Sequence, residues 1–120
     1  MKYTEKELEK MLKSDDWRER REVAEQGYGL DMLVNDKNWG VREEVAKQGY
    51  GLEKLINDKS WWVRRVVARQ GYGLDKLVYD NDPDIRLAVA RQGYGLDILV
   101  NDEEWWIRAV AKQMLKKKGQ

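Results

Sequence analysis

The stretch QGYGLEKLINDKSWWVRRVVAR, residues 48–69, decides the fold, because the chain writes this unit four times with changes at few positions. The copies begin at Gln26, Gln48, Gln70 and Gln92, each 22 residues after the one before. Internal repetition at a fixed period of this length is typical of a solenoid, in which each unit packs against its neighbours. The sequence therefore predicts a single repeat domain over residues 1–120.

The unit divides the chain into repeats flanked by caps. Full repeats are predicted at residues 26–47, 48–69, 70–91 and 92–113. Residues 1–25 form an amino-terminal half repeat, because MLKSDDWRERREVAE matches the second half of a unit. Residues 114–120 extend the last helix, which runs on through Met114 and Leu115 instead of stopping at a glycine. Both ends are predicted to be capping helices, as stacked repeats require.

Each unit is predicted to hold one longer helix and one short helical segment. Counting the Gln as position 1, position 13 is mostly a residue that caps free helix amides: Asp16, Asn38, Ser60, Asp82 and Glu104. A helix of about nine or ten residues then meets a glycine, the usual left-handed terminator. The remainder, YGLDMLVND in the first full repeat, has room only for a short α or 3-10 segment. The predicted fold class is all-α, a right-handed solenoid.

The QGYGL motif is predicted to be a joint between helices rather than a ligand-binding loop. A phosphate-binding loop needs glycines between a strand and a helix, but here a helix precedes them and no Lys-Ser or Lys-Thr pair follows. Gly27 is expected to end one helix and Gly29 to begin the next. Tyr28, between them, is expected to pack back onto Val23 and forward onto Leu33.

Apolar and charged positions recur with the same spacing in every unit. The predicted core of the first full repeat is Leu30, Leu33, Val34, Val41 and Val45, with the same positions in the next repeat. An Asp and an Arg also stand six apart in each repeat, as Asp36 and Arg42 do. Because the pair recurs in every unit, it is predicted to form a hydrogen-bonded ladder, within a unit or between neighbours, rather than a set of binding-site charges.

The stretches DNDPDIRLAVARQ, NDKNWGVREEVAK and NDEEWWIRAVAK resemble the leucine-rich repeat variant family and, more distantly, HEAT-like repeats. The resemblance covers about residues 12–113 and implies a superhelix of alternating α and short 3-10-like helices. A member of that family carries an iron-sulfur cluster on a cysteine-bearing segment, which this cysteine-free chain cannot provide. The near-identity of the units fits either a recently duplicated bacterial repeat gene or an engineered binder scaffold.

Composition argues against enzyme chemistry and several kinds of partner. The sequence has no cysteine and no histidine, so no catalytic residue, cofactor or metal site is predicted. Lys and Arg number 23 against 22 Asp and Glu, and the resulting net charge of +1 disfavours nucleic acid as a partner. No apolar run is long enough for a membrane span, and the start MKYTEKELEK is too charged for a secretory signal. A cytoplasmic protein is predicted.

The residues that differ between copies indicate where a partner binds. Positions 14, 15, 18 and 22 are predicted to form one outer stripe across the long helices. Trp and Arg gather there in repeats two to four, and Tyr79 replaces an Asn found in the other repeats. This composition is typical of an interaction surface for a protein or peptide. The candidate partner-binding residues are Trp61, Trp62, Arg65, Arg69, Tyr79, Asp84, Leu87, Arg91, Trp105 and Trp106.

Alternative interpretations of these residues stay open at this point. Trp recurs at position 14 in four of the five long helices, so these indoles are candidates for covering a neighbouring turn instead of binding a partner. Exposed tryptophans also support a homodimer or another structural, self-associating scaffold. Weak nucleic-acid binding through arginines and tryptophan stacking is a further alternative, which the interspersed acidic residues disfavour.

Overall fold

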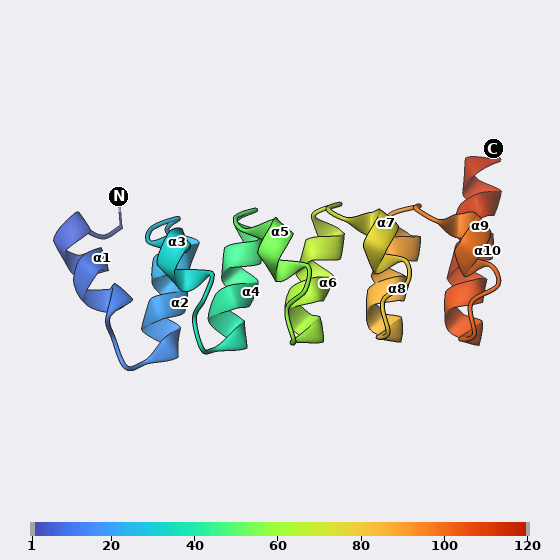
Figure 1. Ribbon diagram of the computed structural model, residues 1–120. Coiled ribbons are helices and arrows are strands. Elements are labelled where there is room, and N and C mark those ends of the chain that lie inside the picture. Colours follow the sequence, from blue (N-terminus) through green and yellow to red (C-terminus); the bar gives the residue numbers. More distant parts are fainter. Residues whose placement is uncertain (1, 120) are drawn as a thin grey trace.

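The computed structural model describes residues 2–119, and every regular element in that range is a helix. Over these described residues, ten helices follow one another along an array whose principal extents are 53 × 28 × 20 Å (Figure 1). Each long helix packs against the long helix of the next unit, and the short helices lie between them in sequence. This arrangement confirms the predicted all-α solenoid.

The helices alternate between two lengths after the first. The long helices are α2 (Trp17–Glu25), α4 (Trp39–Lys47), α6 (Trp61–Arg69), α8 (Pro83–Arg91) and α10 (Trp105–Lys118). The short helices are α3 (Leu30–Leu33), α5 (Leu52–Leu55), α7 (Leu74–Leu77) and α9 (Leu96–Leu99). Helix α1 (Glu5–Leu12) packs on α2 and buries Leu8 and Leu12 against it. It therefore covers the first long helix, as a cap should.

Position 13 is the cap residue directly before each long helix, as predicted. Asp16, Asn38 and Asp82 each accept a hydrogen bond from the amide two residues later, whereas Ser60 and Glu104 make no such side-chain bond. In the four repeats the Asp at position 11 supports this residue, because its carboxylate accepts the amide of position 13 at 2.9 Å. The start of the helix is therefore fixed by two polar side chains in α4 and α8, and by the Asp at position 11 alone in α6 and α10.

The QGYGL motif is a joint, as predicted. Gly27 has φ +72°, and its N–H bonds to Ala24 O at 2.9 Å. The N–H of Tyr28 reaches back to Val23 O at 3.2 Å, so the two bonds together satisfy the last carbonyls of α2. Gly29, with φ +64°, is the residue before α3. The joint thus reverses the chain with two left-handed glycines around one tyrosine.

The short segments are single α-helical turns rather than 3-10 helices. Leu33 N bonds to Gly29 O at 3.0 Å and Val34 N to Leu30 O at 2.9 Å, the four-residue spacing of an α-helix. The core prediction holds for Leu33, Val34, Val41 and Val45, which are 8% exposed or less. Leu30 and its counterpart in the next repeat, Leu52, are only half-buried at the edge of the core.

The predicted Asp–Arg ladder is present, and its rungs join neighbouring units. Arg42 donates from Nε and Nη2 to the carboxylate of Asp58 at 2.7 and 3.1 Å, while its Nη1 donates to the carbonyl of Asp36 at 2.7 Å. The Asp six residues earlier therefore contributes its backbone, and the Asp sixteen residues later contributes its charge. The rungs are Arg20–Asp36, Arg42–Asp58, Arg64–Asp80 and Arg86–Asp102.

The ladder side chains are largely buried. The ladder pattern changes in the first and last units. Burial raises the pKa of Asp102, but the hydrogen bonds from Arg86 and from the Glu104 amide outweigh it and leave that pKa below its ordinary value. Ser14 stands where the repeats have Asp, and its hydroxyl accepts the amide of Asp16 without adding a charge. Arg108, in the last long helix, bonds to the carbonyl of Asp102 alone.

Candidate functional site

On the outer face, tryptophans at the start of one long helix contact the next long helix. Position 14 of one long helix lies beside position 15 of the following one. A Cβ added to Gly40 in α4 would lie 3.1 Å from the ring of Trp17 in α2, and the ring of Trp39 in α4 stacks on Trp62 in α6. Gly40 therefore leaves room for an indole, and Trp62 supplies a second indole at the same position one unit later.

Three indoles and one guanidinium form an aromatic cluster, defined as Trp39, Trp61, Trp62 and Arg65. The ring centres of Trp61 and Trp62 lie 4.0 Å apart at 24°, and those of Trp39 and Trp62 lie 5.7 Å apart at 15°. The Arg65 guanidinium lies 4.7 Å from the Trp62 ring and 5.3 Å from the Trp61 ring. Trp39 and Trp62 remain 45% and 37% exposed, so the cluster offers apolar surface in a fixed geometry.

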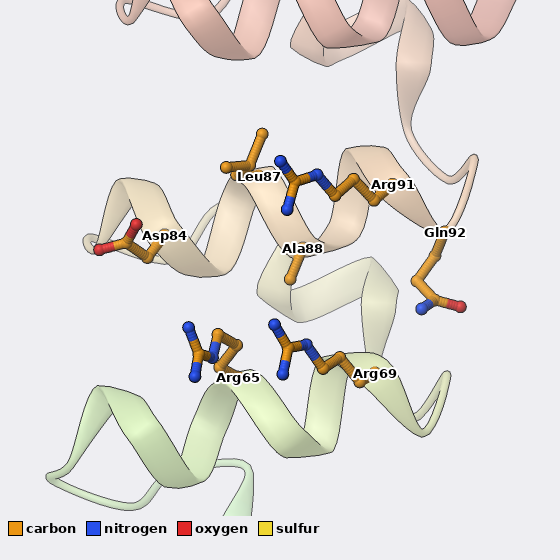
Figure 2. Close-up of a pocket in the computed structure, with 7 residues that line it drawn as sticks. All are labelled: Arg65, Arg69, Asp84, Leu87, Ala88, Arg91 and Gln92. Carbon is orange, nitrogen blue, oxygen red and sulfur yellow. The ribbon is translucent and has the colours of Figure 1, made fainter.

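Next to this cluster, α6 and α8 enclose a small cleft of about 200 Å³. Its lining residues, which define the arginine cleft, are Arg65, Arg69, Asp84, Leu87, Ala88, Arg91 and Gln92. In Figure 2 the side chains of Arg65 and Arg69 rise from α6 toward α8, and that of Arg91 lies along α8 beside Leu87. Two neighbouring helices thus contribute three arginine side chains to the lining of one cleft.

The three arginines of the cleft lack the acidic partners that the same positions have in earlier helices. In α2, Arg21 at position 18 pairs with Glu25 at position 22 at 3.8 Å. In α4 the order is reversed, and Glu43 pairs with Lys47 at 3.7 Å.

In α6 both positions carry arginine, and Arg91 of α8 follows Leu87, so neither helix can form this pair. Within residues 2–119, Arg65, Arg69 and Arg91 make no ion pair, although Asp84 lines the same cleft. Two like charges at this spacing destabilise an isolated helix by about 0.2–0.5 kcal/mol. The positive charge of the cleft therefore stays available to a ligand.

Trp105 and Trp106 form a separate pair on α10. Their rings meet edge to face with centres 6.0 Å apart, and they make no ring contact with the aromatic cluster among the described residues. Trp105 is 68% exposed and Trp106 is 36% exposed. The structure thus divides the predicted face into the α6–α8 region and this pair.

Tyr79 lies away from the arginine cleft. Its side chain is 68% exposed and lines shallow depressions over the Asp–Arg ladder, together with residues such as Asn57, Asp80 and Asn101. None of the residues that line these depressions also lines the cleft. The structure therefore does not bring Tyr79 together with the other predicted residues.

Three residues of the region were not among the predicted site residues. Trp39 is part of the aromatic cluster, and Ala88 and Gln92 line the cleft. Position 14 of one unit contacts position 15 of the next, so the predicted residue Trp62 at position 15 indicates Trp39 as its neighbour. Ala88 and Gln92 carry no such indication, since alanine and glutamine at these positions fit a packing role equally well.

Metal sites and membrane-spanning helices are both absent from residues 2–119. No group of three or more Asp or Glu side chains in the described part of the chain could hold a metal ion. Among the same residues, no helix is long and apolar enough to cross a membrane. Compared with protein-family models and with curated proteins, the chain matches none of them.

Proposed function

We propose that this protein is a non-enzymatic helical repeat module that binds a protein or peptide through the aromatic cluster and the arginine cleft. The observation that carries the proposal is the stack of Trp39, Trp62 and Trp61 with Arg65 laid over it, because the rest of the repeat unit is devoted to the scaffold. Trp and Arg are the residue types that contribute most to the affinity of protein interfaces.

The proposed mechanism is binding to a surface that is already ordered. The indoles stack on one another and Arg65 rests on two of them, so a ligand would bury apolar area while immobilising few additional side chains. The long helices that hold these residues are in turn fixed by buried ladder bonds. The partner would therefore carry an apolar side chain for the cluster and an acidic group for the cleft.

Replacing both Trp62 and Trp106 by alanine is expected to weaken peptide binding by about 30-fold, the effect of losing one strong interface residue. Peptides are first selected from a displayed random library against the wild-type chain, and their affinities for the two proteins are then compared by calorimetry. Met32→Ala, which removes an apolar side chain on the short helix α3 that is more exposed than Trp62 (58% against 37%), is the control and should leave the affinity unchanged. Equal affinities for the double variant, with its circular dichroism intact, would refute the proposed face.

Self-association is the second candidate function, and the exposure of Trp105 favours it. At 68% this ring is the most exposed tryptophan of the chain. If the chain dimerises through it, the mass measured by light scattering will rise with protein concentration, and Trp105→Ala will abolish the rise. A mass that is independent of concentration would leave peptide binding as the better supported of the two.

Weak nucleic-acid binding is a third candidate, which a titration with single-stranded DNA separates from peptide binding. An affinity for single-stranded DNA that falls steeply with salt would support it. The buried roles of Arg64 and Arg86 in the ladder speak against it, because they remove two arginines from the exposed set.

We also propose that the array is related to leucine-rich repeat variant and HEAT-like repeats. The alternation of short and long helices and the Asp–Arg ladder support this relationship. The absence of cysteine in 120 residues is consistent with a reducing compartment such as the cytoplasm.

A further inference from the structure

We propose that the arginine cleft recognises a phosphorylated serine or threonine side chain of the partner segment. This inference rests on the proposed function, since it names the chemical group that the cleft would bind. It starts from the charges at positions 18 and 22. In α2 and α4 these positions hold an ion pair, whereas α6 has Arg65 and Arg69 there and α8 has Arg91 at position 22. The exchange removes from α6 and α8 the ion pair that α2 and α4 have at these positions.

The charge in the cleft matches a doubly charged anion better than a single carboxylate. Three guanidinium groups and the carboxylate of Asp84 give the lining residues a formal net charge of +2 (three positive, one negative). A phosphate monoester carries about −1.5 to −2 at pH 7 and offers three acceptor oxygens. A glutamate side chain carries one charge on two oxygens, so it would leave at least one of the three arginines unmatched.

The size of the cleft restricts what can enter it. A volume of about 200 Å³ is below the range of about 300–1,000 Å³ that is typical of sites for nucleotides and other whole small molecules. It is suited to one side-chain group that projects from a longer partner. Nucleic acid presents phosphodiesters with one charge each along a line, whereas here three arginines from two helices line one small cleft.

Arg65 is held in place before any ligand arrives. Its guanidinium stacks on Trp61 and Trp62, and its Nε is buried without a hydrogen-bond partner. Arg21 lies over Trp17 in a similar way, and its Nε is likewise buried without a hydrogen-bond partner, but a carboxylate oxygen of Glu25 at 3.8 Å supplies a salt-bridge partner. A phosphate oxygen would give Arg65 the partner that Glu25 gives Arg21. Leu87 and the indoles would contact apolar side chains on either side of the phosphorylated residue.

The test uses small probes and the arginine side-chain signals of the full chain. N-acetyl-phosphoserine methylamide is titrated into ¹⁵N-labelled protein at constant ionic strength while the Nε–Hε resonances are followed by NMR. Saturable shifts are expected at Arg65, Arg69 and Arg91 but not at Arg21. The glutamate analogue of the probe and a dinucleotide phosphodiester should each bind at least about tenfold more weakly, because they carry one charge. Equal binding of either, or equal shifts at Arg21, would overturn the assignment.

Two variants and a pH series complete the test. Arg69→Glu places in α6 the Arg–Glu arrangement that α2 already has, so the fold should survive while affinity for the phosphoserine probe falls at least about tenfold. Arg21→Gln is the matched control and should bind within about twofold of wild type. Lowering the pH from 7.5 to 5.5 should weaken binding, since phosphate loses its second charge near pH 6 and arginine does not titrate. An affinity independent of pH would contradict recognition of a dianion.

This experiment separates the inference from the function on which it rests. If unphosphorylated peptides are selected and their binding depends on Trp62, peptide binding stands and the phosphate inference fails. If no peptide binds but the phosphoserine probe gives saturable shifts that Arg69→Glu removes, the cleft is an oxyanion site and the peptide-binding proposal fails.

Discussion

Replacing Arg42 by alanine is expected to lower the free energy of unfolding by about 3–5 kcal/mol, the usual cost of breaking a buried ion pair from one side. Arg42 and Asp58 have side chains only 9% and 7% exposed, and Arg42 also holds the carbonyl of Asp36. The variant leaves the Asp58 carboxylate without its bidentate partner and the Asp36 carbonyl without a donor. Urea unfolding followed by tryptophan fluorescence measures the loss.

The chain provides its own control for this prediction. Arg108 occupies the same position in α10 but bonds only to a backbone carbonyl, so Arg108→Ala should cost about 1–2 kcal/mol. Replacing Arg42 by methionine and Asp58 by leucine together should cost much less than Arg42→Ala, because no charge is left buried. Equal losses for Arg42→Ala and Arg108→Ala would mean that the Asp–Arg rungs between units contribute little to stability.

The second large effect is expected from Gly51→Ala. Gly51, the residue before α5, has φ +66°, and an added Cβ would lie 2.6 Å from a methyl group of Val34 in the preceding unit. Val34 is buried and β-branched, so this methyl group cannot turn away easily. The left-handed backbone contributes about 1–2 kcal/mol of strain and the overpacking about 1–3 kcal/mol more. We expect a total loss of about 2–5 kcal/mol in the same unfolding measurement.

Gly49→Ala separates the backbone from the packing contribution. Gly49 has φ +77°, but nothing lies within 4 Å of an added Cβ. Its replacement should therefore cost only the backbone strain, about 1–2 kcal/mol. If Gly49→Ala and Gly51→Ala lose the same stability, the close approach between Gly51 and Val34 does not limit the packing of the units.

The fold could be predicted where it depends on sequence features that lie within one repeat unit. The position-13 caps, the terminating glycines and the 22-residue period are local features, and the structure follows them. The rung partner could not be chosen, because every repeat carries an identical Asp and Arg. Whether Arg42 pairs with Asp36 or Asp58 depends on how units stack, which spacing along one unit does not reveal.

The candidate site was predicted less completely for a similar reason. Five of the predicted residues line one cleft, since they lie on one stripe of two adjacent helices: Arg65, Arg69, Asp84, Leu87 and Arg91. Trp39 was missed because its contact is with Trp62 of the next unit, and Tyr79 was misplaced because it follows the short helix α7 rather than lying on a long one. The loss of the ion pairs at positions 18 and 22 was visible in the sequence, but its meaning depends on the unpaired arginines facing one cleft.

The ladder and the glycine joints lie at opposite ends of the long helices, and this gives the array unequal elasticity. Near the helix starts, each neighbouring pair of units is clamped by a bidentate rung such as Arg64–Asp80. Near the helix ends, a hydrogen bond such as that from Gln70 to the Lys47 carbonyl, at 3.3 Å, is weaker and exposed. We expect neighbouring units to separate more readily at the glycine edge of the array than at the ladder edge. Arg69 and Arg91 end their helices at that edge, so a small spread would adjust the width of the cleft without stretching a single rung.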